Sequence, residues 1–154
     1  MNMRTVLLTL ALCFAAALTC FAADANVGTW KLNEAKSKIP AGAPKNVNIV
    51  YTAEGDQYKC VIDGVDGSGK PTHNEWTGKF DGKDYPVTGA PDTDLRSIQM
   101  VDKSHYKVAT KKDGKTNVTG TVAFSPDGKT RTLTTTGSDP KGKKVTATYV
   151  YDKQ

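Results

Sequence analysis

Several residue types are scarce in this chain, and each scarcity excludes a class of protein. The sequence has three cysteines and two histidines in 154 residues. Cys13 and Cys20 fall within an N-terminal apolar run, so the remainder keeps only Cys60 and cannot form an internal disulfide. The sequence contains no Gly-x-Ser-x-Gly elbow, no His-Glu-x-x-His pair and no phosphate-binding glycine loop. We therefore expect a protein that is not an enzyme, holds no metal or cofactor, and depends on packing and strand pairing for stability.

The one long apolar run marks a targeting segment. It extends from Thr5 to Ala22 behind Arg4, as in the core of a signal peptide. Ala23-Asp24-Ala25 offers small side chains at the third and first positions before a cut, with a cut after Ala22 as the alternative. An uncleaved membrane anchor is the competing interpretation.

We accordingly expect a signal peptide at residues 1–25 and a single domain at 26–154. The mature protein would be secreted or periplasmic, with no stable membrane insertion after cleavage. Its length suits one ordinary domain. The net charge is +5, and the lysines are spread along the chain rather than gathered on a stripe with aromatic residues between them. This pattern indicates a solvated surface and no nucleic-acid partner.

The remaining sequence alternates apolar and polar residues with a period of two, which is typical of half-buried strands. Val47, Ile49 and Tyr51 lie two apart, and so do Tyr58, Cys60 and Ile62. The same pattern recurs to the end of the chain. It predicts about ten strands, at 28–32, 46–53, 57–65, 73–80, 83–88, 95–101, 104–111, 116–125, 129–136 and 143–151.

Turn signals separate these strands. Asp81-Gly82, Asp113-Gly114 and Asp127-Gly128 each place a residue that tolerates positive φ beside a glycine, as tight hairpins require. Residues 33–38 are expected to form one helical turn capped by Asn33. We predict an all-β fold, an antiparallel up-and-down meander closed into a barrel, because closure removes both exposed edges. A two-sheet sandwich is the alternative.

The two ends of the predicted domain resemble the calycin superfamily, which comprises the lipocalins and the intracellular fatty-acid-binding proteins. The resemblance rests on Gly28-Thr29-Trp30-Lys31-Leu32 near the start and on Tyr149-Val150-Tyr151-Asp152-Lys153 at the end. It implies a calycin-like barrel in which Trp30 closes the floor and the last strand returns beside the first. The strand number is similar to the fatty-acid-binding branch. Where that branch carries an Arg-x-Tyr pair, this chain has Tyr149 and Tyr151.

The positions of the arginines give the most specific indication of a ligand-binding site. Only Arg96 and Arg131 follow the leader, and alternation places Arg96 on the face of Ile98 and Met100, and Arg131 on that of Leu133. A guanidinium that faces an enclosed space needs an anion, hydroxyl groups or water. We therefore predict a ligand-binding site made by two arginines, a tyrosine pair and three apolar or aromatic neighbours: Arg96, Arg131, Tyr149, Tyr151, Trp76, Tyr106 and Met100. The alternative is that both arginines lie at strand ends and reach solvent or a local Asp.

These residues favour a barrel that binds or carries a small hydrophobic or amphipathic molecule without transforming it. Whether the aromatic interior is a cavity or a filled core stays open at this point. His73 and His105 are expected on the outer face. The alternative function is an extracytoplasmic protein-interaction module, such as an enzyme inhibitor, that uses the loops 63–71 and 88–94.

Overall fold

The computed structural model describes residues 24–138 and 141–154, so the predicted signal peptide, apart from Asp24 and Ala25, lies outside the described residues. Within these limits the chain is built from β-strands joined by short turns, and only one short helical turn interrupts them. No helix in the described part of the chain is long and apolar enough to span a membrane.

The fold is all-β, as the alternation predicted. The ten strands are β1 (Gly28–Leu32), β2 (Lys45–Glu54), β3 (Gln57–Val65), β4 (Pro71–Gly78), β5 (Asp81–Thr88), β6 (Leu95–Asp102), β7 (His105–Lys112), β8 (Lys115–Phe124), β9 (Thr130–Ser138) and β10 (Lys144–Lys153). Every neighbouring pair is antiparallel, and the strands follow one another round the sheet in chain order. The predicted meander is therefore confirmed.

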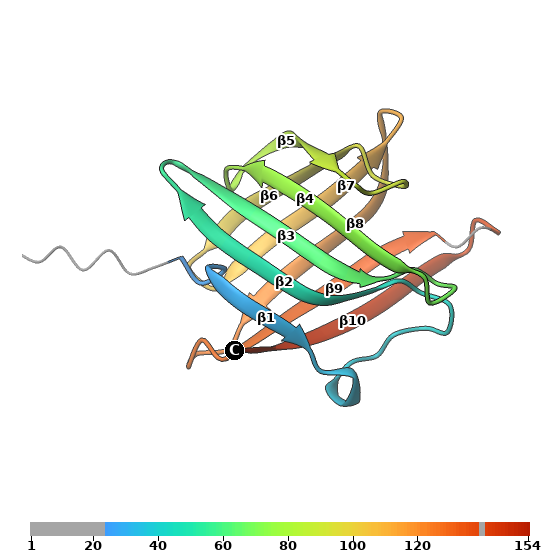
Figure 1. Ribbon diagram of the computed structural model, residues 1–154, viewed down its shortest axis with the longest axis horizontal. Helices are drawn as coiled ribbons and strands as arrows, with labels where there is room; N and C mark the ends of the chain where they lie inside the picture. Colours follow the sequence, from blue (N-terminus) through green and yellow to red (C-terminus); the bar gives the residue numbers. More distant parts are fainter. Residues whose placement is uncertain (1–23, 139–140) are drawn as a thin grey trace, which may run out of the picture.

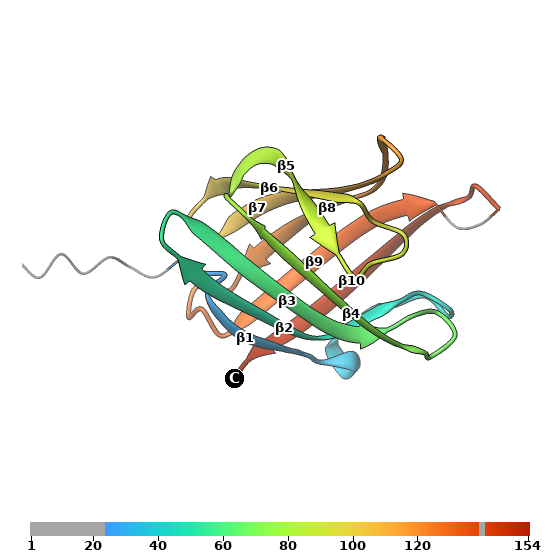
Figure 2. The same ribbon diagram turned by 45° about the horizontal axis from the view of Figure 1, so that its top comes forward.

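The sheet closes into a barrel because β1 pairs with both β2 and β10. Trp30 lies opposite Ile49 on β2 and opposite Lys153 on β10, which joins the first strand to the last. Figure 1 shows this closure along the lower side of the molecule. In Figure 2, the strands β2 to β4 pass in front of β8 to β10 and cross them at a steep angle. The predicted closed barrel is confirmed, and the sandwich is excluded.

Asp113-Gly114 forms the predicted tight hairpin turn, and Asp127-Gly128 lies in the longer connection between β8 and β9, whereas Asp81-Gly82 falls at the start of β5 rather than in a turn. In the β7–β8 turn, Asp113 has a φ of 49° and Gly114 a φ of 73°, so two consecutive residues adopt the left-handed conformation. This geometry matches the right-handed twist of the flanking strands, and it is the reason that Asp-Gly favours a two-residue hairpin. Asn33 accepts a hydrogen bond from the backbone N–H of Lys36 and caps the short helix η1 (Glu34–Lys36), also as predicted.

Hairpins alternate between the two ends of the barrel, so the ends differ. We call the end with the β2–β3, β4–β5, β6–β7 and β8–β9 turns the floor, and the opposite end the mouth. The floor lies on the left of Figure 1 and the mouth on the right. At the floor, Trp30 is fully buried and its ring centre lies 5.3 Å from that of Phe124. Tyr106 packs edge-on against Phe124 at 5.8 Å, so large aromatic rings fill this end.

The mouth half of the interior has a different lining. Several of its inner-face residues are small or medium-sized and only half-buried: Gly64, Thr72, Thr135, Gly137 and Val145. The chain therefore places large aromatic side chains at the floor and several smaller inner-face residues towards the mouth.

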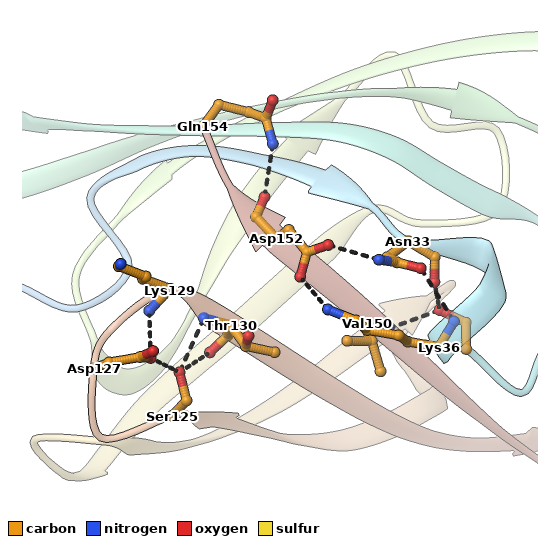
Figure 3. A network of polar contacts seen from close by, with 10 residues as sticks. Asn33, Lys36, Ser125, Asp127, Lys129, Thr130, Val150, Asp152 and Gln154 are labelled. Carbon is orange, nitrogen blue, oxygen red and sulfur yellow. Dashed lines mark hydrogen bonds and ion pairs between the residues drawn. The ribbon is translucent and has the colours of Figure 1, made fainter.

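Polar contacts from η1 reinforce the closing seam between β1 and β10 (Figure 3). The Asp152 carboxylate accepts hydrogen bonds from Asn33 Nδ2 at 2.6 Å and from Lys36 Nζ at 3.1 Å. Ser37 Oγ accepts from the backbone N–H of Val150 at 2.9 Å. These contacts tie the segment after β1 to β10, over more than a hundred residues of sequence.

Candidate ligand-binding site

Arg131 occupies the interior, as alternation predicted. It lies on β9 opposite Phe124 of β8 and Tyr151 of β10, and only 4% of its surface is exposed. Its Nε and Nη1 atoms are buried and have no hydrogen-bond partner in the protein. The alternative in which Arg131 reaches solvent from a strand end is therefore excluded.

Two tyrosine rings lie next to this guanidinium. The Arg131 Cζ atom lies 5.3 Å from the ring centre of Tyr151 and 6.0 Å from that of Tyr51. The π faces of these rings attract the cation, but the N–H donors of a guanidinium lie in its own plane. The aromatic contacts therefore stabilise part of the buried charge, and the Nε and Nη1 donors still have no hydrogen-bond partner in the protein.

Arg96 is the second interior cation. It lies on β6, is half-buried, and donates from Nη2 to the Oδ1 of Asn74 on β4 at 3.1 Å. Its Nη1 is buried without a partner. Its backbone carbonyl accepts a hydrogen bond from Trp76 Nε1 at 3.0 Å, which fixes the indole against β6. Arg96 thus has one neutral side-chain partner and a remaining donor.

Neither arginine has a carboxylate counter-ion among the described residues. The ion pairs in residues 24–138 and 141–154 all use lysine or histidine as the cation, on the outside of the barrel. Buried charges in proteins are normally paired, because desolvation of an unpaired ion costs several kcal/mol. Two interior guanidinium groups without a carboxylate are therefore suited to accept an anion.

Tyr51 and Cys60 lie opposite each other on β2 and β3 and belong to the same interior cluster. Burial raises the pKa of Tyr51 and that of the Cys60 thiol, while the positive charges of Arg96 and Arg131 oppose the rise in both. Both arginines are therefore close to this pair of side chains. With the phenol and the thiol kept neutral, the net charge of the cluster comes from the two guanidinium groups.

The two predicted tyrosines of the last strand have different surroundings. Tyr151 is fully buried, its hydroxyl has no partner, and burial raises its pKa. Tyr149 instead donates from its hydroxyl to the carbonyl of Pro44 at 3.1 Å, on the segment before β2. Tyr151 is therefore available to a ligand beside Arg131, whereas the hydroxyl of Tyr149 already has a structural partner.

The structure brings only some of the other predicted residues to the arginines. Trp76 is buried opposite Cys60 and is held by the Arg96 carbonyl. The Tyr106 hydroxyl donates a hydrogen bond to the Asp24 carboxylate at the floor. Met100 has the inner-face register opposite Tyr106, but it lies near the end of β6 and is 42% exposed. Neither Tyr106 nor Met100 therefore shares the arginine cluster.

Sequence reasoning did not include Tyr51, Cys60 and Asn74 in the site. Period-two alternation put Tyr51 and Cys60 on the inner face, but nothing in a linear pattern shows that strands β2, β3 and β4 present them to arginines from β6 and β9. The available signal was the pairing of Tyr51 with Cys60 across the Glu54-Gly55-Asp56 turn. His73 and His105 face outward, as predicted, beside Asp63 and Asp102 respectively.

A shallow groove of about 460 Å³ lies apart from this cluster, on the outer face of β6 to β9, and is lined by polar side chains that include Ser97, Lys107, Thr121 and Thr134. Neither arginine lines it.

Together these features define a closed ten-stranded antiparallel barrel with a cationic and aromatic interior, an architecture compatible with a calycin-like fold. No protein-family model matches the chain, and no curated protein matches it in sequence.

Proposed function

We propose that this protein is an exported, calycin-like barrel that binds or carries a small amphipathic molecule without transforming it. The ligand's anionic head lies at Arg131 and Arg96, beside Tyr51 and Tyr151. Its apolar part extends towards the mouth. The observation that supports this proposal most directly is the pair of buried, unpartnered donor atoms on Arg131.

The described residues offer no acceptor to the buried Nε and Nη1 donors of Arg131. An arginine that is 4% exposed and has no carboxylate pays for desolvation without an ion pair. An anionic ligand would supply acceptors in the guanidinium plane, and charge-assisted hydrogen bonds are about twice as strong as neutral ones. A neutral ligand of the same shape would leave the donors unpaired.

The lining of the barrel supports an amphipathic rather than a wholly polar ligand. Trp76, Tyr51 and Ile98 are buried near the arginines. Several inner-face residues towards the mouth are small, whereas the large aromatic rings pack at the floor. An apolar chain placed there would bury its surface against Val108 and Leu133, which are only partly buried in the unliganded protein.

The test compares two probes that differ only in charge: a fatty acid and the alcohol of the same chain length. Binding to the purified barrel is measured by displacement of a fluorescent amphiphile and by native mass spectrometry. We expect one molecule per chain and at least about tenfold tighter binding of the acid, as one or more charge-assisted hydrogen bonds would give. Equal affinity for both probes would exclude the arginine-centred site. Failure to bind either probe would favour the protein-interaction module instead.

A further inference from the structure

The first described residues form a tight turn that packs against the floor. The backbone N–H of Val27 donates to the carbonyl of Asp24 at 2.9 Å, and that of Asn26 donates to Asp24 Oδ1 at 2.9 Å. Ala25, between them, packs against the hydrophobic core. The segment Asp24–Val27 is therefore part of the folded barrel.

Side chains from distant strands hold this turn in place. The Tyr106 hydroxyl donates to both Asp24 carboxylate oxygens, at 3.0 and 2.9 Å. Trp30 Nε1 donates to the carbonyl of Asn26 at 2.8 Å in a buried contact, and Asn26 is 2% exposed. Burial and the Asp24 carboxylate both raise the pKa of Tyr106, so the phenol keeps the proton that it donates. Asp24 thus connects the start of the barrel to β7.

We propose that the exported chain is processed at the Ala22–Ala23 bond, so that Asp24 and Ala25 stay in the mature protein and complete its floor. This inference concerns a processing site and depends on export of the protein, but not on the ligand. Cys20 and Ala22 supply the small side chains required at the third and first positions before this cut.

The other candidate cut, after Ala25, conflicts with the floor in two ways. It would remove the carboxylate that accepts from Tyr106 and from the Asn26 backbone. It would also create a charged α-amino group at Asn26, whose backbone nitrogen makes a part-buried hydrogen bond to Asp24 Oδ1 in the intact chain. A partly buried ammonium group that has lost this carboxylate is unfavourable. A residue discarded with a leader has no reason to fit the mature fold, whereas Asp24 makes three side-chain hydrogen bonds in it.

The direct test is the N-terminus of the secreted protein. The full chain is expressed in a bacterial host with a secretory pathway, recovered from the extracytoplasmic fraction, and analysed by intact mass and N-terminal sequencing. We expect Ala23 as the first residue. A protein that begins at Asn26, or one that retains Met1, would overturn the proposal.

A second test examines the floor without relying on export. Chains 23–154 and 26–154 are made directly, each with and without Tyr106→Phe. We expect 23–154 to melt several degrees higher, and Tyr106→Phe to lower the melting temperature in 23–154 but not in 26–154. Equal melting temperatures, or the same effect of Tyr106→Phe in both lengths, would overturn the role of Asp24.

Two variants keep this second test interpretable. Tyr149→Phe removes a tyrosine hydroxyl that bonds to Pro44, far from the floor turn, and should lower the melting temperature equally in both lengths. If 26–154 does not fold, Asp24→Ala in 23–154 replaces it: we expect a lower melting temperature and no further loss from Tyr106→Phe. Independent, additive effects of these two substitutions would contradict the proposal.

Discussion

Arg131 and Tyr151 face each other across β9 and β10, with the guanidinium carbon 5.3 Å from the centre of the tyrosine ring. Their pairing places a permanent cation on the inner wall, next to the face of the tyrosine ring. Tyr51 approaches the same cation from β2, on the opposite side of β1. Closure of the barrel allows both tyrosines to reach the same guanidinium. Strands β2 and β9 are far apart in sequence, but only β1 and β10 lie between them around the wall.

Replacement of Arg131 by leucine tests the charge directly. We expect Arg131→Leu to weaken binding of the fatty-acid probe by about tenfold or more, because the anion loses its charge-assisted partner. The unliganded protein should keep its stability or gain about 1–3 kcal/mol, since an unpaired buried charge is replaced by an apolar side chain. Displacement titration and urea unfolding measure the two effects.

Two further variants separate charge from geometry at this position. Arg131→Lys keeps the positive charge but loses the planar set of donors, so we expect an intermediate affinity. Lys107→Met removes a lysine from the outer face of β7 and should leave probe binding unchanged. Retention of full affinity by Arg131→Leu would refute the assigned head-group position.

Cys60 provides a chemical reporter for the same cluster. It is fully buried, and burial raises the pKa of its thiol, so both access and thiolate formation are suppressed. We expect alkylation by iodoacetamide to be on the order of 100-fold slower in the native protein than in urea, because it requires local opening. The fatty-acid probe should slow it further. Labelling of the native protein at the denatured rate would show that the interior is open to solvent around β3.

The sequence was sufficient for the fold because its local signals agree with one another. Alternation in segments such as Tyr58, Cys60 and Ile62 identifies the strands, and Asp-Gly turns make successive strands antiparallel neighbours. The inward direction of Arg131 follows from the same periodicity. Closure was predictable on a different ground, namely that an open meander of this length would expose two edges.

The composition of the site was less predictable from the sequence. Alternation gives the face of the sheet from which a side chain projects, but not the position that its terminal atoms reach. Tyr149 and Tyr151 share a face, but only the Tyr149 hydroxyl reaches a carbonyl, at Pro44. Met100 obeys the alternation and is nevertheless exposed, because β6 ends two residues later. Asn74 contacts Arg96 only because β4 and β6 lie on either side of β5.

Asp152 is the residue to change at the closing seam. Its hydrogen bonds to Asn33 and Lys36 lower its pKa, so its charged form favours the folded state. We expect Asp152→Ala to reduce the free energy of unfolding by about 1 kcal/mol at neutral pH, as measured in urea.

The pH dependence of this difference identifies its cause. A lowered carboxyl pKa gives stability that is present above the ordinary value of about 3.9 and is lost as the pH falls through the folded value. The gap between the wild-type protein and Asp152→Ala should therefore close in acid. Glu54→Ala, at an exposed position beside the β2–β3 turn, is the control and should change stability little at any pH. A gap that persists in strong acid would point to lost packing instead.

His73 should give stability a pH dependence opposite in sign to that of Asp152, and near neutral pH. Its Nδ1 lies 2.7 Å from Asp63 and its Nε2 lies 3.5 Å from Glu75; hydrogen bonds to these two carboxylates raise its pKa. A raised histidine pKa gives stability that is fully present below about 6.5 and is lost as the pH rises through the folded value. We expect the urea midpoint to fall slightly between about pH 6 and pH 8, and His73→Gln to remove this fall. An unchanged slope in His73→Gln would mean that another group titrates there, since the mutated side chain carries no proton in this range.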